Sequence, residues 1–199
     1  MTTDIMGEPR HTGPDFAALT PYQARVHEAI KSGPRGNVVG PLRIWLTSPE
    51  MAEKAQALGQ YARYDSVLPP MLSELAILVT ARIWSSGFEW VHHAPLALEA
   101  GLPPEAVAAI GQGRCPDLAD PECKAVFDFA AELHRDRAVS EPVYRAAEAA
   151  LGAQGVVDLV AICGYYTLIS MTINAFEVPD GAGMALPQID LAPQDMFRS

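Results

Sequence analysis

The sequence predicts an all-α fold, and three observations support this. Helix-start signals recur along the 199 residues: Thr20-Pro21, Ser48-Pro49 and Asp120-Pro121 each combine a capping side chain with proline at the first helical position. No run of alternating apolar and polar residues is long enough to form a sheet. Hydrophobic residues make up 49% of the chain and charged residues 19%, which is typical of a folded protein.

The N-terminal third carries three expected helices. Thr20, Pro21 and Gln23 give the first helix an N-cap, a first-turn proline and a capping-box partner, and Gly33-Pro34 ends it. A short helical segment follows, and Ser48-Pro49 then starts a longer helix. These signals predict helices over residues 21–32, 41–47 and 49–65.

The remaining helices follow from the same kinds of signal. Two apolar helical segments follow, and Gly101 ends the second of them. Asp120-Pro121 starts another helix, Ser140 with Pro142 is a looser start, and Gly152 is a stop. The expected helices cover residues 70–84, 86–100, 103–111, 121–138, 141–151 and 155–176.

One domain, residues 16–178, is expected between two less regular ends. Residues 1–15 are polar, lack the apolar core of a signal peptide and predict a flexible N-terminus. Residues 179–199 are rich in proline and glycine and predict a tail that packs on a neighbour or stays mobile. Residues 156–176 are about long enough to cross a bilayer, but their polar residues favour a buried helix at the centre of an oligomer. We therefore expect a cytoplasmic protein with no membrane partner.

Charge and cysteine content exclude several functional classes. The net charge is −10, and three lysines and eleven arginines are scattered without a basic patch, so nucleic acid is not an expected partner. An anionic substrate would need a local arginine. Cys115, Cys123 and Cys163 contain no short-spaced pair, which argues against a disulfide framework or a zinc site. No metal or organic cofactor is expected.

The segment from Glu74 to His93 places ionisable side chains in an otherwise apolar stretch. Such groups are costly on an apolar helix unless they are paired or used. In one continuous helix turning about 100° per residue, His92 lies at about 0° and His93 at about 100° from Glu74. Arg82 and Glu89 lie between these directions, so the polar groups share one face.

Ser85-Ser86-Gly87 is a weak point in that helix. Ser86 and Glu89 match the Ser-x-x-Glu capping box, so a second helix can begin at about Gly87. Its free N–H groups would bind an anion or an oxyanion, and Glu89 would lie one turn from His93. A proton carrier, an orienting carboxylate and donors for negative charge are the parts of a general acid/base site.

A purely structural interpretation explains the same residues. Ser86 and Glu89 can serve only as a cap, Arg82 can serve only to neutralise Glu74, and His92 can face solvent. The density of ionisable groups in so apolar a segment favours an active site.

Motifs outside this segment carry a family resemblance over about residues 38–178. They are Gly40-Pro-Leu-Arg43, Ser48-Pro-Glu50, Leu58-Gly-Gln-Tyr-Ala-Arg63, Leu68-Pro-Pro70, Glu74-Leu-Ala-Ile-Leu78, Glu89-Trp90, His93, Ala97 to Gly101 and Glu105. Together they resemble the carboxymuconolactone decarboxylase family of the alkylhydroperoxidase D-like superfamily. The resemblance implies a compact helical bundle that assembles as a trimer or a hexamer.

The peroxidase branch of that superfamily carries a glutamate, cysteines at +12 and +15, and a histidine at +19. Counted from Glu74, these positions fall on Ser86, Glu89 and His93, so both cysteines are absent. Peroxide reduction in that branch depends on a thiolate nucleophile and a resolving thiol. The resemblance therefore points to the decarboxylase-like branch.

In the type reaction of that branch, a carboxylated butenolide loses carbon dioxide, and the resulting dienolate is protonated on carbon. The resemblance leads us to expect a catalytic set of three residues. His93 delivers the proton with Glu89 orienting it, and Glu74 positions Arg82 or a water.

The expected substrate is a small carboxylate or lactone, bound by Arg82, His92 and the backbone amides near Ser86 and Gly87. Two alternatives from other classes stay open. One is a peroxidase or antioxidant protein of the alkylhydroperoxidase D type, and the other is a non-enzymatic small-molecule binder on the same fold.

Overall fold

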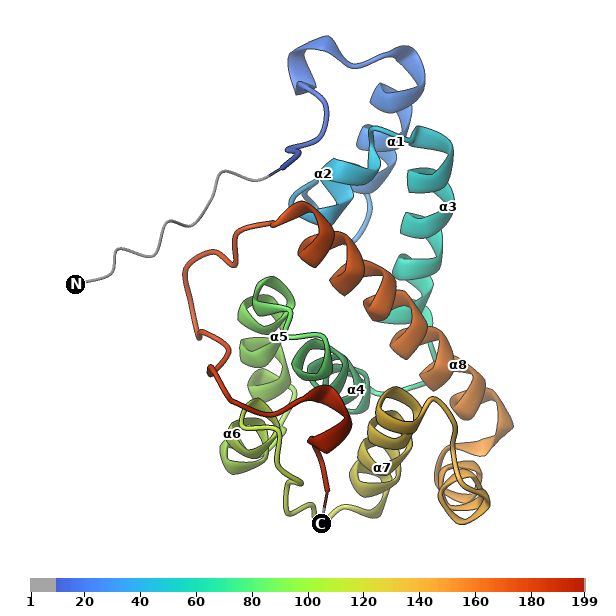
Figure 1. Cartoon of the computed structure of the whole chain (residues 1–199). Helices are drawn as coiled ribbons and strands as arrows, with labels where there is room; N and C mark the ends of the chain where they lie inside the picture. Colours follow the sequence, from blue (N-terminus) through green and yellow to red (C-terminus); the bar gives the residue numbers. More distant parts are fainter. Residues whose placement is uncertain (1–9, 199) are drawn as a thin grey trace, which may run out of the picture.

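The computed structural model describes residues 10–198, and over that range it contains helices and no strands. Eight α-helices follow one another along the chain (Figure 1). Their bounds are α1 Pro21–Ser32, α2 Pro41–Trp45, α3 Pro49–Gln60, α4 Pro70–Ile83, α5 Gly87–Glu99, α6 Pro104–Gly111, α7 Pro121–Asp136 and α8 Glu141–Phe176. Short helical turns occupy Phe16–Ala18 (η1), Tyr61–Asp65 (η2, a π-helix) and Pro193–Asp195 (η3). The all-α prediction is confirmed.

Helix starts lie where capping residues and prolines predicted them. Thr20 and Gln23 form both bonds of a capping box at α1, and the Asp120 side chain accepts from the Glu122 amide at α7. Ser48 and Ser140 make no side-chain cap bond, so the following prolines carry those starts. Gly152 has φ of 71° and breaks α8 where a stop between two helices was expected.

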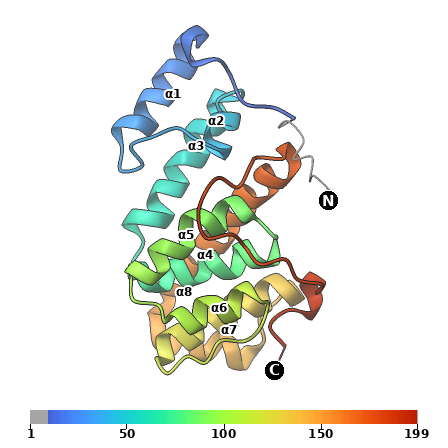
Figure 2. The ribbon, with the colours of Figure 1, turned by 90° about the vertical axis from the view of Figure 1, so that its left-hand side faces the viewer.

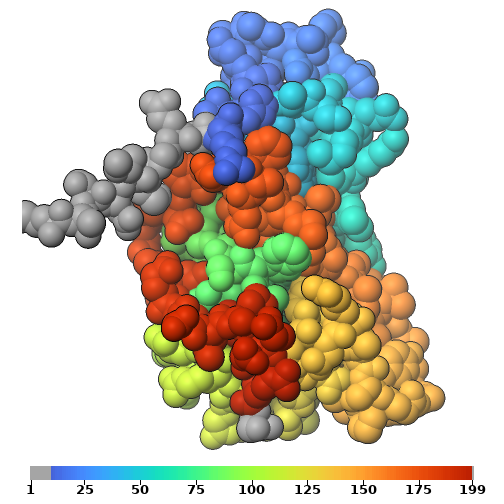
Figure 3. Space-filling model, viewed as in Figure 1, coloured from blue at the N-terminus to red at the C-terminus, as the bar shows by residue number. Residues whose placement is uncertain are grey.

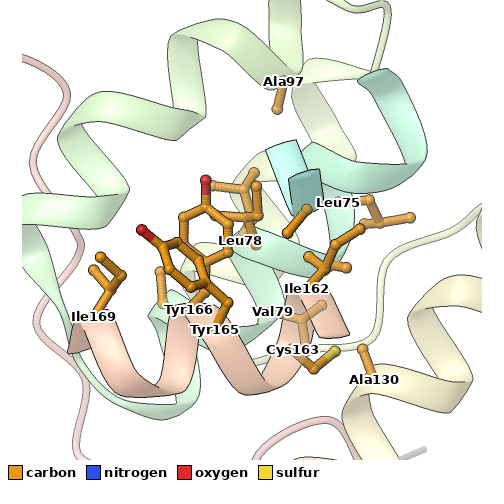
Figure 4. Close-up of a cluster of buried hydrophobic side chains, with 14 of the residues drawn as sticks. Leu75, Leu78, Val79, Ala97, Ala130, Ile162, Cys163, Tyr165, Tyr166 and Ile169 are labelled. Atoms are coloured by element: carbon orange, nitrogen blue, oxygen red, sulfur yellow. The ribbon is translucent and has the colours of Figure 1, made fainter. Parts of the chain in front are cut away.

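The core forms around α4. Every residue from Leu72 to Ile83 is buried, and α4 packs against α5, α6, α7 and α8. Figures 1 and 2 show α1–α3 at one end of the molecule, α4–α7 at the other, and α8 running along both. Leu75 and Leu78 of α4 meet Ala97 of α5 and Ile162 of α8 in this core (Figure 4). Burying each leucine contributes about 2 kcal/mol, so α4 is the main source of packing energy.

The most apolar helix of the chain is α8, and it is long enough to cross a membrane. In its most apolar window, however, 61% of the residues are buried against the rest of the chain. This burial is that of a core helix.

The C-terminal segment packs against other parts of its own chain. Residues 177–198, which follow α8, are here called the C-terminal strap. They run past α5 and α6 and reach α7 (Figures 1 and 2). Leu186, Met196 and Phe197 are buried, and the Phe197 amide donates to the Gly113 carbonyl at 2.8 Å. The strap thus packs on its own chain, a third arrangement beside the two expected for this tail.

The N-terminal prediction lies largely outside the described residues, which begin at Arg10. From there the chain is fixed: the Arg10 amide and guanidinium donate to carbonyls at the C-terminal end of α8. Arg10 also forms an ion pair with Glu177 at 2.6 Å. Arg10 therefore links the start of the described chain to the C-terminal end of α8.

Candidate active site

A sharp break separates the two helices that carry the candidate site. α4 ends at Ile83, Ser85 has φ of 49°, and α5 begins at Gly87. The Ser86 amide donates to the Ala81 carbonyl at 2.9 Å and so closes the end of α4. The break predicted at Ser85-Ser86-Gly87 is confirmed, and the continuous helix is wrong.

The capping box predicted from Ser86 and Glu89 does not form. Ser86 makes no side-chain cap bond, and its buried Oγ has no partner among the described residues. Glu89 instead points along α5 toward His93.

His93 lies between two carboxylates that come from two helices. Its Nδ1 is 2.6 Å from Oε2 of Glu74 on α4, and its Nε2 is 3.3 Å from Oε2 of Glu89, one turn earlier on α5. All three side chains are buried. A carboxylate can only accept, so the short contact fixes the Nδ1–H tautomer and leaves Nε2 to share a proton with Glu89.

The electrostatics of this chain of three groups favour a charged imidazole. Burial lowers the pKa of His93, but the hydrogen bonds and charges of Glu74 and Glu89 raise it more, so it lies above its ordinary value. These contacts favour the protonated imidazole, in which both ring nitrogens can donate to a carboxylate.

His93 and Glu89 border a cavity of about 200 Å³. The cavity is bounded by α5, α8, η2 and the segment before α2. Its walls are Arg35, Val39, Pro41, Leu42, Arg63, Phe88, Glu89, His92, His93, Pro95, Leu96, Tyr165, Tyr166 and Ile169. Glu74 does not line the cavity, so its carboxylate lies behind His93, whereas Glu89 and His93 face the cavity. The volume suits a small ligand held by a few polar groups in an apolar wall.

Two arginines in the cavity were missed by sequence reasoning. Arg35 precedes α2 and donates to the Tyr165 hydroxyl at 3.0 Å, while its buried Nε has no partner among the described residues. Arg63 lies on η2, and over residues 10–198 no carboxylate pairs with either guanidinium. Arg63 does appear in the motif Leu58-Gly-Gln-Tyr-Ala-Arg63, but no periodicity reveals where its side chain points. Two uncompensated cations in a chain of net charge −10 make this cavity a place for an anion.

Two tyrosines of α8 form the floor beside His93. The Tyr166 ring meets the His93 ring edge-on, with centroids 5.0 Å apart, and Tyr165 packs edge-on against Tyr166. Burial raises the pKa of Tyr166 well above its ordinary value, and it raises that of Tyr165 to about 12. Both phenols are therefore neutral hydrogen-bonding groups at physiological pH.

Arg82 does not reach the cavity, so its expected role in substrate binding has no geometric basis. Its guanidinium donates to the carbonyls of Gly111 and Pro187 at 3.2 and 2.7 Å and to Ser85 Oγ at 2.8 Å. It therefore ties the C-terminal strap to α4 and α6, and it does not pair with Glu74.

Ser86 and Gly87 also lie outside the cavity lining. A Cβ at Gly87 would come within 2.0 Å of Oδ2 of Asp180, so a carboxylate of the strap already occupies the start of α5. The anion site expected there is thus taken by the chain itself. His92 does line the cavity, where its ring stacks on Phe88 at 4.2 Å and its Nδ1–H donates to the Phe88 carbonyl.

The three cysteines lie away from His93, and none lines the cavity. Burial raises the pKa of Cys163 to about 12 and that of Cys123 to about 11, and it also raises the pKa of the exposed Cys115. Peroxide-reducing thiols have lowered pKa values, so these three are in the wrong environment for that chemistry. Within residues 10–198, no group of three or more His, Cys, Asp or Glu side chains is placed to hold a metal ion.

A larger hollow of about 400 Å³ lies between α7 and the end of the C-terminal strap. Its two cationic side chains are already paired, Lys124 with Asp128 and Arg135 with Asp136. It contains no histidine and no proton chain, so the smaller cavity beside His93 is the better candidate.

Comparisons with known proteins bear on the family and the fold. Residues 49–132, which include Glu74, Glu89 and His93, match the model of the Carboxymuconolactone decarboxylase family. No curated protein matches the chain. A solved structure of an uncharacterized peroxidase-related protein from Silicibacter sp. TM1040 has a TM-score of 0.69 at 16% identity, covering 89% of this chain and 96% of that chain. At that identity the likeness shows the fold alone, and it confirms the alkylhydroperoxidase D-like bundle.

Proposed function

Residues 49–132 match the carboxymuconolactone decarboxylase family, and from that premise we propose that the chain is a cofactor-free lyase that decarboxylates a small carboxylated lactone or ring-cleavage acid. One observation carries the proposal: buried His93 lies between the carboxylates of Glu74 and Glu89 at the edge of a small cavity that also contains two arginines. A decarboxylase of this kind needs a proton donor, a cationic environment for an anion, and a poorly solvated cavity.

The proposed roles follow from the contacts. Glu74 accepts from Nδ1 and orients the imidazole, which is the part first expected of Glu89. His93 and Glu89 share the proton that is delivered, and both side chains border the cavity. Arg35 and Arg63 attract the anionic substrate and stabilise negative charge that develops on its oxygen.

The reaction then proceeds in two steps. The bond between the ring carbon and the carboxylate breaks, carbon dioxide leaves, and the electron pair moves into the lactone carbonyl to give a dienolate. A proton from the His93–Glu89 pair then adds to carbon, and a proton from water restores the pair. Neutral Tyr165 and Tyr166 keep the floor of the cavity uncharged and limit the access of water.

The antioxidant alternative has less support, because no thiol borders the cavity and all three cysteine pKa values are raised. We place the protein in the cytoplasm, because its three free cysteines are typical of a reducing compartment. We also propose that it assembles as a homo-oligomer.

The experiment is a screen of the purified protein against carboxylated butenolides and related ring-cleavage acids, following carbon dioxide release and substrate absorbance. The His93→Ala variant should lose turnover while its circular dichroism stays unchanged. His27→Ala, a change to a histidine on α1 outside the cavity, is the matched control and should retain turnover. Full turnover in His93→Ala would sink the assignment, and ligand binding without any turnover would favour the non-enzymatic binder.

A further inference from the structure

The geometry leaves the proposed reaction without the oxyanion donors that the sequence predicted. Those donors were the backbone amides near Ser86 and Gly87, but neither residue lines the cavity. Asp180 of the C-terminal strap lies against Gly87, and Figures 1 and 3 show the strap on the surface beside α5. A dienolate carries negative charge on the former carbonyl oxygen, so the reaction requires a hydrogen-bond donor elsewhere in the cavity.

Tyr165 on α8 carries a hydroxyl group whose own proton has no acceptor in the protein. The side chain is only 2% exposed, and it lines the cavity. Its oxygen accepts a hydrogen bond from Nη2 of Arg35 at 3.0 Å. Within residues 10–198, no carbonyl, carboxylate or hydroxyl group accepts from the Tyr165 O–H. A buried donor without an acceptor is costly, so this O–H is available to an oxygen atom of a bound ligand.

Arg35 makes this phenol a stronger donor. A guanidinium that donates to the phenol oxygen polarises its O–H bond, and hydrogen bonds arranged in such a chain strengthen one another. Burial raises the pKa of Tyr165 to about 12, although the positive charges of Arg35 and Arg63 oppose this rise. The phenol therefore keeps its proton at neutral pH and can donate it to an oxyanion without transferring it.

The fold makes room for this pair at Gly59 of α3. A Cβ at Gly59 would overlap the hydroxyl end of Tyr165 and the guanidinium of Arg35. Glycine is among the least favourable residues in a helix, and this close approach gives its presence a packing reason. The Tyr165 ring is also held edge-on by Trp45 and Tyr166, with centroids 6.1 and 5.4 Å away. A donor fixed in this way needs no rearrangement when charge develops on the ligand.

The hydroxyl of Tyr165 and the proton donor border the same cavity. A dienolate shares its charge between the oxygen and ring carbons two and four bonds away, so the two donors must face one small space. Tyr165, His93 and Glu89 all line that space. Tyr166 lies between Tyr165 and His93, but among the described residues no arginine donates to its hydroxyl. Tyr165 is therefore the better placed of the two phenols.

We propose that Tyr165 is the oxyanion donor of this site and that Arg35 positions and polarises it, an assignment that rests on the proposed function. As the bond to the carboxylate breaks and carbon dioxide leaves, the electron pair reaches the lactone carbonyl oxygen, and the Tyr165 O–H donates a hydrogen bond to that oxygen. The phenol keeps its proton throughout. When a proton from the His93–Glu89 pair adds to carbon, the charge leaves the oxygen and the carbonyl group is restored. Arg63 supplies the general attraction for the anion.

A binding experiment on the full chain tests the donor without any turnover. The probe is tetronate, the enolate of 4-hydroxy-2(5H)-furanone, which combines a lactone ring with a delocalised oxyanion, and 2(5H)-furanone is its neutral counterpart. Calorimetry should show tighter binding of tetronate. Tyr165→Phe should weaken tetronate binding by about 10- to 100-fold and furanone binding much less, because a hydrogen bond to a neutral carbonyl is weaker. Tyr144→Phe, on α8 outside the cavity, is the matched control and should bind both compounds as the wild type does.

A double-mutant cycle tests whether Arg35 acts through Tyr165. Arg35→Met should weaken tetronate binding in the wild-type background and add little to the loss in Tyr165→Phe. Equal effects of Arg35→Met in both backgrounds would overturn its positioning role, because Arg35 would then contact the anion directly. A larger loss in Tyr166→Phe than in Tyr165→Phe would overturn the choice of donor. Circular dichroism should be the same for all variants.

Turnover kinetics separate this assignment from the proposed function. Because the oxyanion forms only as the bond breaks, Tyr165→Phe should lower kcat by about 100- to 1,000-fold with little change in KM. An unchanged kcat in Tyr165→Phe would overturn the oxyanion donor and leave decarboxylation established. Tetronate binding that depends on Tyr165, without carbon dioxide release from any substrate, would instead refute the decarboxylase and leave the oxyanion site in place.

Discussion

Replacing Glu74 by glutamine tests the proton chain without knowledge of the substrate. The change keeps the shape of the side chain and removes the charge that lies 2.6 Å from Nδ1 of His93. Both side chains are buried, so water cannot replace the lost interaction. The glutamine amide can also donate to Nδ1. This favours the tautomer with its proton on Nε2, whereas the Glu74 carboxylate favours a proton on Nδ1.

The expected loss of stability follows from the kind of hydrogen bond removed. A bond to a charged group contributes about 1.5–3 kcal/mol and a neutral bond about 0.5–1.5 kcal/mol, so Glu74→Gln should cost about 1–2 kcal/mol. In a chain of this size each kcal/mol lowers Tm by about 2–4 °C, so Tm should fall by about 2–8 °C.

The loss should depend on pH in a defined direction. The folded-state pKa of His93 is raised above 6.5, so its stabilising effect is fully present below pH 6.5 and is lost as pH rises through the folded pKa. Because the Glu74 carboxylate is the strongest of the groups that raise this pKa, the Tm difference between wild type and Glu74→Gln should be larger at about pH 6 than at about pH 9.

Thermal unfolding over this pH range, with NMR titration of the histidine rings, measures both effects. The His93 pKa should fall in Glu74→Gln, while Glu99→Gln, an exposed glutamate on α5, should change neither quantity. An unchanged His93 titration together with an unchanged Tm would refute the buried pair.

Three further predictions address other parts of the molecule. Arg63→Met should raise KM for an anionic substrate by about 10- to 100-fold with little change in fold, whereas Arg114→Met, at an exposed arginine outside the cavity, should leave KM unchanged. Arg82→Ala removes three hydrogen bonds from a buried guanidinium and should cost about 3 kcal/mol; limited proteolysis should then cut the C-terminal strap before the helices. Alkylation should modify the exposed Cys115 and leave turnover intact. Loss of turnover on alkylation would instead support a mechanism that uses a thiol.

Sequence reasoning succeeded where structure is set locally. Prolines, caps and glycines fix helix ends within a few residues of the chain, so the starts at Pro21, Pro49 and Pro121 and the break at Gly152 were predictable. The turn at Ser85 shows the limit of this reasoning. It changes the direction of the chain, so Glu74 meets His93, whereas a continuous helix would have aligned it with His92.

Contacts between distant segments could not be predicted in this way. Arg82 binds the carbonyl of Pro187, 105 residues later, and nothing in its own helix indicates that partner. Arg35 lies in a loop, which has no regular period. Arg63 lies in a π-helix, whose wider turn does not follow the α-helical period used to predict side-chain direction. The cationic part of the cavity therefore became visible only in the folded chain.

The position of Glu89 explains how one scaffold can support a different chemistry. In the peroxidase-branch motif that the chain resembles, this position holds a cysteine between a glutamate and a histidine. Here the same glutamate and histidine are in contact, and a carboxylate instead of a thiol lies 3.3 Å from Nε2 at the cavity edge. An imidazole beside a thiol yields a thiolate nucleophile, whereas an imidazole beside a carboxylate shares a proton with it and forms no covalent bond.

Ser86, at the other cysteine position, is buried, lacks a partner among residues 10–198 and does not border the cavity, so a second reactive group is absent there as well. Glu74, His93 and Glu89, without either cysteine, are the residues that the proposed acid/base reaction requires.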